Sequence, residues 1–244
     1  MAARHRPSGG TRGGEIVLLK SIADLEIRAP VRGSADRSTS RSAVPRFDLH
    51  CHSTHSDGLL APAAVVARAA ERGVDVLALT DHDEVSGLAE AREAAAAGGI
   101  TLICGSELSV SWGNITIHVV ALGIDPQNAI LLGGLETIRS GRTARARRIA
   151  DALASAGIPG AFEGAMKYVT SERLVSRTHF ARYLVEAGYA RETRDVFKHY
   201  LTRGKPGYVA HQWAALSQAV DWIHAAGGQA VIAHPGRYDV SATG

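Results

Sequence analysis

Short apolar segments alternate with helical patterns over the first half of the ordered-looking sequence. The predicted strands are residues 47–52, 74–79, 100–104 and 115–122. Ala-rich helical segments separate the first three strands, one from Pro62 to Gly73 and one from about Ser86 to Ala97. This alternation predicts an α/β fold with a parallel sheet that is either open or closed into a barrel.

The pattern changes to helices from Asp125 to about His211, and a strand pattern resumes at Gln229–Ala233. We expect a helical insertion at about 126–211 that lies over the strand ends. Residues 1–45 are rich in Arg, Ser, Gly and Ala, which is typical of a disordered segment. The predicted organisation is therefore a disordered basic extension at 1–45 followed by one domain at 46–244.

The charge distribution limits what the basic pI near 9.0 means. Residues 1–46 hold nine Lys/Arg and four Asp/Glu, a net charge of +5, whereas the remaining residues hold eighteen and twenty, a net charge of −2. The near-neutral domain argues against a wide face that neutralises many phosphates of DNA. We therefore expect no stable complex with nucleic acid.

Two other features of the sequence limit which classes of protein are possible. No run approaches the roughly 20 apolar residues that a membrane-spanning helix needs, and two cysteines are too few for a disulfide framework. We expect a cytoplasmic protein without a membrane partner, in which Cys51 and Cys104 are reduced thiols. The oligomeric state is left open.

Histidines and carboxylates recur where the predicted strands end. His50 and His52 are two residues apart on a strand, so both side chains project from the same face. The other residues of this kind are Asp57, His82, Glu107, His118 and His234. A lone histidine on a strand is usually structural, and we interpret Asp81 and Asp83 as ordinary loop or helix-capping residues. Repetition at successive strand ends nevertheless indicates a site for divalent metal ions.

Four separated motifs then resemble one known family. They are Asp48-Leu49-His50-Cys51-His52 with Ser53-Thr54-His55-Ser56-Asp57-Gly58, Thr80-Asp81-His82-Asp83, Gly105-Ser106-Glu107, and His234-Pro235-Gly236. In this order they resemble the PHP (polymerase and histidinol phosphatase) superfamily of metal-dependent phosphoesterases. The Ser-Asp-Gly variant, with the segments 177–182 and 204–206, is most similar to the subgroup of nucleoside 3′,5′-bisphosphate phosphatases and 5′-3′ exoribonucleases.

The resemblance implies a distorted (β/α)7 barrel that carries two or three Mn, Fe, Zn or Mg ions. It implies that the metal ligands are His50, His52, Asp57, His82, Glu107, His118 and His234. Glu107 would bridge two ions, and catalysis would depend on Glu107, His234 and Arg237. The residues that would face substrate phosphates are Arg177, His179, Lys205 and Arg237.

Members of the family also have a later Asp-x-His that supplies further metal ligands, and nothing in this sequence matches it. We therefore expect a chain truncated at its C-terminus, with the final strand or strands of the barrel missing. Open positions on the ions lead us to expect weak metal retention and low activity.

The expected function is metal-dependent hydrolysis of phosphate esters. The substrates implied are nucleoside 3′,5′-bisphosphates, which would lose the 3′-phosphate, and short RNA, which would be trimmed from its 5′ end. Two alternatives are a small-molecule phosphatase of the histidinol phosphatase type and a catalytically silent domain that binds metal or nucleotide. A helix bearing Arg142, Arg145, Arg147 and Arg148 is either a solvated charged face, which we favour, or a surface that guides RNA.

Overall fold

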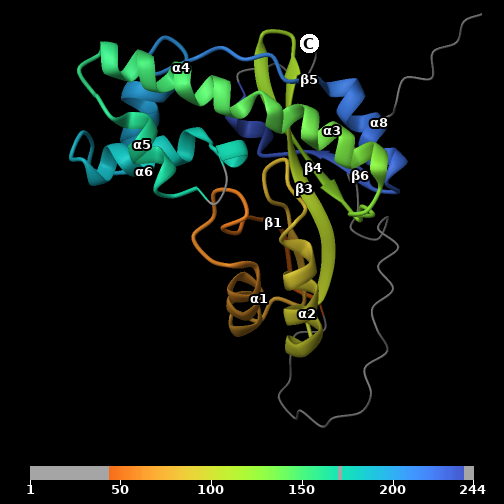
Figure 1. Cartoon of the computed structure of the whole chain (residues 1–244). Helices are drawn as coiled ribbons and strands as arrows, with labels where there is room; N and C mark the ends of the chain where they lie inside the picture. The colour runs from red at the N-terminus through yellow and green to blue at the C-terminus, as the bar shows by residue number, and fades with distance from the viewer. Residues whose placement is uncertain (1–43, 170–171, 239–244) are drawn as a thin grey trace, which may run out of the picture.

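A six-stranded sheet with helices packed on it forms the body of the protein (Figure 1). The computed structural model describes residues 44–169 and 172–238, so almost all of the predicted N-terminal extension lies outside the described residues. The strands are β1 (Phe47–Cys51), β2 (Val76–Leu79), β3 (Thr101–Trp112), β4 (Ile115–Leu122), β5 (Ala214–Ala215) and β6 (Gln229–Ile232). The sheet order is β1-β2-β3-β4-β6, and β5 pairs with β3.

The helices follow the predicted boundaries closely where the sequence signals are strong. Pro62 starts the first helix, since its fixed φ and missing N–H suit a first helical position. Asn128 caps another by accepting hydrogen bonds from two backbone N–H groups. The α-helices are α1 (Pro62–Glu71), α2 (Leu88–Gly98), α3 (Ala129–Ser140), α4 (Arg142–Ser155), α5 (Ala161–Met166), α6 (Arg177–Glu186), α7 (Thr193–Val196) and α8 (Leu216–Ala225). Shorter helical turns are η2 (Glu172–Leu174), η3 (Phe197–Leu201, a π-helix) and η4 (Pro235–Arg237).

The strand directions correct part of the prediction. β1, β2 and β3 are parallel as expected, but β4 is antiparallel to both β3 and β6. The reason is that β3 continues to Trp112 instead of ending at Cys104, and then reverses through a tight turn at Gly113. Gly113 has a φ of 54°, which suits the turn of a two-residue hairpin between Trp112 and Ile115. The fold class is α/β, but its sheet is mixed.

Three hydrophobic clusters hold helices and strands together around the sheet. One packs α1 and α2 on β2, and a second packs α3 and α8 on β3 and β4. A third lies among the strands and includes Val76, Ile103, Val120 and Leu122. In Figure 1 the long β3 runs from the α1–α2 end of the molecule to the α3–α8 end. The middle of β3 therefore lies at the centre of the body.

A separate hydrophobic cluster forms the helical part of the chain. Its residues come from α4 to η3 and include Ile149, Leu153, Phe180 and Leu184, all essentially inaccessible to solvent. We call this part, residues 142–169 and 172–201, the helical lobe, and Figure 1 shows it to one side of the sheet. α3, which falls within the predicted insertion, packs on the sheet instead. In the described part of the chain, no helix is long and apolar enough to cross a membrane.

Candidate metal centre

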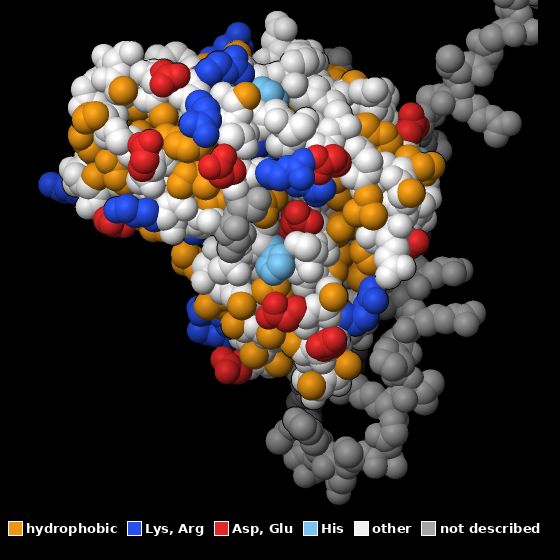
Figure 2. All heavy atoms as spheres, viewed as in Figure 1, with side chains coloured by type: hydrophobic (Ala, Val, Ile, Leu, Met, Phe, Trp, Pro, Cys, Tyr) orange, Lys and Arg blue, Asp and Glu red, His pale blue; other side chains and the backbone are white. Residues whose placement is uncertain are grey.

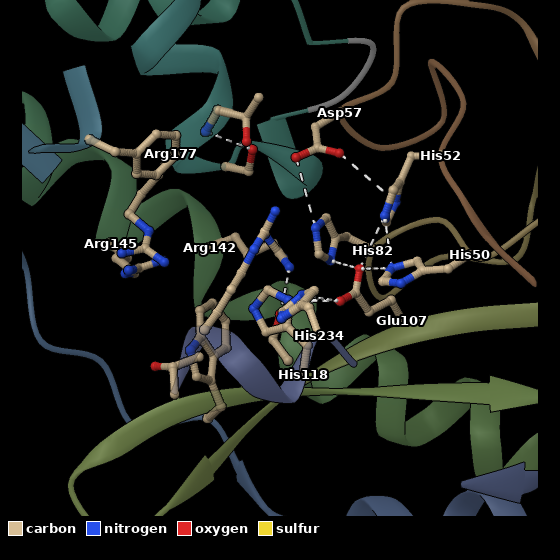
Figure 3. A pocket seen from close by; sticks show the side chains of 17 residues that line it. His50, His52, Asp57, His82, Glu107, His118, Arg142, Arg145, Arg177 and His234 are labelled. Atoms are coloured by element: carbon tan, nitrogen blue, oxygen red, sulfur yellow. Dashed lines mark hydrogen bonds and ion pairs between the residues drawn. The ribbon is translucent and has the colours of Figure 1, made fainter. Parts of the chain in front are cut away.

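A buried carboxylate on β3 is the centre of the site. Glu107 is 1% exposed, and nitrogen atoms of five imidazoles lie 2.9–3.4 Å from its two oxygens (Figure 3). These rings belong to His50, His52, His82, His118 and His234. Burial alone would raise the pKa of Glu107, but hydrogen bonds from His118, His234, His50 and His52 lower it far below its usual range. Glu107 is therefore ionised at neutral pH.

Each ring reaches Glu107 because of where β3 lies in the sheet. His50 is on β1, and His52 follows that strand. His82 follows β2, and its backbone forms a parallel bridge with Glu107. His118 projects from β4, the antiparallel neighbour of β3, and His234 follows β6. Four separate segments thus converge on the middle of one strand.

Asp57 supplies a second carboxylate on the far side of two of these rings. Its oxygens lie 3.9 Å from His52 Nδ1 and 3.8 Å from His82 Nε2, so both rings stand between Asp57 and Glu107. Burial would raise the pKa of Asp57, but His82 and His52 lower it to about 2. Gly58 is required beside it, since a Cβ there would lie 2.3 Å from the carbonyl oxygen of His52.

The donor atoms fit divalent cations. A neutral imidazole has one N–H, so it cannot donate a hydrogen bond from each ring nitrogen. His50 Nε2 nevertheless lies 3.3 Å from His52 Nε2, and both atoms also lie close to Glu107. The Nδ1 atoms of His82 and His234 are buried and make no hydrogen bond with the described residues. Three groups of ligand atoms lie within 4.8 Å of one another, namely His50 with His52 and Glu107, His52 with Asp57 and His82, and His82 with Glu107 and His118. His234 Nε2 lies 3.1 Å from Glu107. Imidazole nitrogen and carboxylate oxygen in this arrangement suit Zn, Mn or Fe.

Asp81 fixes the loop that carries Asp57. Its carboxylate accepts hydrogen bonds from the backbone N–H of Ser53 at 2.7 Å, from Ser53 Oγ at 2.6 Å and from Ser56 Oγ at 2.6 Å. It is 2% exposed. Asp81, interpreted from the sequence as a loop or helix-capping residue, thus holds the segment between two candidate ligands.

Asp83 joins the metal centre to the helical lobe. Its carboxylate is fully buried, accepts hydrogen bonds from the backbone N–H and Oγ of Ser109, and forms an ion pair with Arg142 of α4. Burial would raise the pKa of Asp83, but Arg142 lowers it. Asp83 and His234 are the two non-glycine residues with positive φ in the described chain, at 53° and 33°. Such conformations cost about 1–2 kcal/mol per residue and cluster at functional sites.

A cavity of about 500 Å³ opens onto these ligands, which is within the size range of small-molecule sites. Apart from the metal-ligand candidates, its wall consists of charged, polar and aromatic side chains. They are Ser109, Thr116, Arg142, Arg145, Ser176, Arg177, Thr178, Phe197, Trp213 and Arg237. One wall comes from the strands and the opposite wall from the helical lobe (Figure 3).

A family model for the PHP domain matches residues 48–202, which is more than half of the chain. The chain belongs to the PHP family. It is 57% identical over 200 residues to a 3′,5′-nucleoside bisphosphate phosphatase of Chromobacterium violaceum, which covers 82% of this chain and 70% of the relative. It is 49% identical over 198 residues to the 5′-3′ exoribonuclease Rnm of Escherichia coli, covering 80% of this chain and 67% of the relative.

Solved structures confirm the PHP fold. An amidohydrolase from Chromobacterium violaceum, with bound sulfate and no metal, has a TM-score of 0.80 and 56% identity over 81% of this chain and 70% of its own. A metal-dependent phosphoesterase from Bifidobacterium adolescentis has a TM-score of 0.75 and 28% identity over 82% of this chain and 72% of its own. The predicted membership of the PHP superfamily is confirmed.

Only some of the residues that were predicted to contact the substrate line the cavity. Arg177 and Arg237 line the cavity, whereas His179 and Lys205 do not. Lys205 is exposed in a turn after η3. His179 is fully buried near the start of α6, where its Nδ1 accepts a hydrogen bond from the backbone N–H of Ser176 at 3.0 Å. His179 thus helps to cap α6, and neither His179 nor Lys205 lines the cavity. Contact of these two residues with substrate phosphates stays a prediction.

Sequence reasoning missed the cavity residues of α4. Arg142 and Arg145 are 4% and 9% exposed, so the interpretation of this helix as a solvated charged face is wrong for both. A signal was present, because these two residues lie on the same helical face as the apolar Ile149 and Leu153. Arg147, in contrast, is 59% exposed.

The burial of His179 predicts a specific response to acid. Burial, only partly offset by Asp57, lowers the pKa of His179 from 6.5 to about 4. The unfolded chain therefore takes up a proton below pH 6.5 that the folded protein does not, so stability falls as the pH drops toward 4. Urea unfolding in EDTA measures the free energy of unfolding at pH 7 and at pH 5. The decrease between these two pH values should be about 2 kcal/mol larger for wild type than for His179→Asn. Equal losses in the two proteins would contradict this assignment.

Proposed function

We propose that this PHP protein hydrolyses phosphate esters of nucleotides, removing the 3′-phosphate of nucleoside 3′,5′-bisphosphates and trimming short 5′-phosphorylated RNA. The observation that carries the proposal is the convergence of five imidazoles and two carboxylates at one end of an arginine-lined cavity. Two relatives, the bisphosphate phosphatase and the exoribonuclease Rnm, carry names that describe these two activities. The protein is a hydrolase of phosphate esters.

The proposed ligands divide between the two carboxylates. Those grouped around Glu107 are His50, His52, His82, His118 and His234, while Asp57 shares His52 and His82. Bound divalent ions supply the chemistry that phosphate ester hydrolysis needs, because they lower the pKa of water toward ~7 and neutralise phosphoryl oxygens. Two or three ions of Mn, Fe, Zn or Mg are proposed.

The side chains around the ligands hold and orient the substrate. Arg177 and Arg237 line the cavity, and guanidinium groups bind phosphate oxygens through paired N–H donors. Glu107 and Asp57, both ionised, orient the rings between them, and Asp81 keeps the loop of Asp57 in place. Catalytic roles for Glu107, His234 and Arg237 are part of the proposal.

The test is a set of parallel assays on protein loaded with Mn²⁺. Adenosine 3′,5′-bisphosphate and a 5′-phosphorylated oligoribonucleotide are expected to be hydrolysed, and histidinol phosphate is expected to be a much poorer substrate. Intact bisphosphate and RNA together with rapid release of phosphate from histidinol phosphate would instead support a small-molecule phosphatase. Bound ions without turnover of any of the three would support a binding domain.

Removal of metal is expected to affect both activity and stability. Dialysis against EDTA should reduce phosphatase activity more than about 100-fold, and Mn²⁺ should restore it. Added Mn²⁺ at about 100 times its Kd stabilises the folded state by about 2.7 kcal/mol, which is a rise in Tm of roughly 5–10 °C. Differential scanning fluorimetry measures the shift. An unchanged Tm with Mn²⁺, Zn²⁺ and Mg²⁺ would show that the cluster holds no ion.

A further inference from the structure

The loop that carries Asp57, residues 53–60, is held from two sides. On the side of the sheet, the carboxylate of Asp81 binds the first half of the loop. On the side of the helical lobe, Nη2 of Arg182 donates hydrogen bonds to the carbonyl oxygens of Asp57 and of Gly58, the second at 3.4 Å. The lobe thus contacts the main chain of the loop at the candidate metal ligand itself.

A second contact from α6 reaches the carboxylate of Asp57. Burial would raise the pKa of this carboxylate, two neighbouring imidazoles lower it, and a hydrogen bond from the Thr178 side chain lowers it further. Residues four positions apart lie on the same face of a helix. Thr178 and Arg182 therefore present adjacent donors to the loop, one for the side chain of Asp57 and one for its backbone.

The helix that supplies these donors is firmly placed. Ser176 caps α6 by accepting a hydrogen bond from the backbone N–H of Thr178 at 3.2 Å. On the opposite face of the helix, Phe180 and Leu184 are fully buried in the core of the helical lobe. A shift of α6 relative to the loop would disturb that core, so α6 is a rigid support.

The two carboxylates of the centre differ in what supports them. Glu107 lies within β3, whereas Asp57 lies in a loop between β1 and α1. Figure 3 shows Asp57 on the other side of two imidazoles from Glu107. These rings are those of His52 and His82, whose nitrogens lie 3.9 and 3.8 Å from the Asp57 oxygens. The position of the loop therefore decides whether Asp57 can share a cation with them.

We propose that Thr178 and Arg182 are positioning residues that hold Asp57 against His52 and His82, so that one ion of the centre depends on the helical lobe. The inference rests on the proposed function, which requires the ions, and it deepens that function by assigning their support. Asp57, His52 and His82 would hold the dependent ion. The ligands grouped around Glu107 would hold the others without help from the lobe.

Metal binding measures the effect directly. Isothermal titration of metal-free protein with Mn²⁺ should show that Arg182→Met weakens one ion by roughly 10- to 100-fold, as expected when a group that orients a ligand is lost. The remaining affinities should stay close to those of wild type. Thr178→Val should weaken the same ion, whereas Thr178→Ser, which keeps the hydroxyl, should retain most of the affinity. Uniform weakening of all ions, or none, would overturn the proposal.

A double substitution distinguishes positioning from a general structural role. Asp57→Asn removes the charge that the two donors hold in place, so it should weaken the same ion. Adding Arg182→Met to Asp57→Asn should then cost little further affinity, because residues that act as one unit do not have additive effects. Full additivity of the two losses would show that Arg182 acts independently of Asp57.

Hydrogen exchange in EDTA tests the loop without any ion. The backbone N–H groups of Ser56 and Gly58 donate to the carbonyl oxygen of Ser53 at 3.1 and 2.8 Å. These two groups should exchange roughly 10-fold faster in Arg182→Met, whereas those of β3 should be unchanged. Faster exchange in a protein that binds no ion would retain the positioning of the loop and reject the metal-dependent function. Ion binding by wild type with unchanged exchange in the variant would do the reverse.

An exposed arginine of the same lobe is the matched control. On the face shown in Figure 2, basic and acidic side chains are interspersed, and no large area of one sign is present. Arg147 of α4 is 59% exposed, and its guanidinium lies 4.4 Å from the centre of the Phe162 ring. Arg147→Met removes the same charge as Arg182→Met, so Mn²⁺ binding and exchange should remain as in wild type. An equal loss of ion affinity in both variants would attribute the effect to the charge of the lobe and contradict the proposal.

Discussion

Glu107→Gln is expected to abolish metal retention and reduce kcat by more than about 100-fold. Changing groups that only orient a metal ligand typically costs 10- to 100-fold, and Glu107 contacts all five imidazoles directly. The amide has nearly the same shape but lacks the negative charge and places N–H donors among ring nitrogens. Metal analysis by mass spectrometry and steady-state assays with adenosine 3′,5′-bisphosphate measure the two effects.

Glu93→Gln is a suitable control for that change. Glu93 is an exposed residue of α2, so the same loss of charge there should leave metal content and kcat within about twofold of wild type, as for other surface substitutions of small energetic effect. Full metal content in Glu107→Gln would mean that the imidazoles and Asp57 suffice to hold the ions. The central role assigned to Glu107 would then be incorrect.

Asp83→Ala is expected to lower the free energy of unfolding by about 3–5 kcal/mol, because it leaves Arg142 charged, buried and unpaired. For a protein of this size the Tm should fall by roughly 6–20 °C. Alanine is also less tolerant than aspartate of the positive φ at this position. Urea unfolding of the metal-free protein gives the free energy, and circular dichroism gives the Tm.

A second substitution distinguishes the effect of losing the ion pair from the effect of losing side-chain volume. Arg142→Met added to Asp83→Ala removes the orphaned charge and keeps much of the side-chain volume, so part of the lost stability should return. Asp83→Asn isolates the charge, since the amide keeps an acceptor for Ser109 and tolerates the backbone conformation. A double variant no more stable than Asp83→Ala would show that the ion pair is not the source of the effect.

Much of the fold was predictable because its signals are local. The predicted strand 74–79 contains β2 (Val76–Leu79), the predicted strand 115–122 is β4, and Pro62 starts a helix as predicted. The direction of β4 was not predictable in this way. The polar residues Gly105, Ser106 and Glu107 resemble the end of a strand, yet they lie within β3 because the site is built in the middle of the sheet.

The candidate ligands were predictable for a different reason. Their spacing follows strand ends, and the structure brings together all seven, including His118, which a single-residue reading would have treated as structural. Asp83 and Arg142 were not predictable, since their pairing joins segments 59 residues apart. The residues next to Asp83 and Arg142 in the sequence do not indicate that these two side chains pair.

The cavity has walls from two hydrophobic cores that are packed independently of each other. Substitutions in the helical lobe can therefore change which molecules enter without disturbing the strands that carry the imidazoles. Divergence of specificity among related enzymes is easiest in such an arrangement, because one wall can vary while the reaction chemistry is retained. The ion pair between Asp83 and Arg142 limits that freedom, since it is one of the contacts that attach the lobe to the sheet.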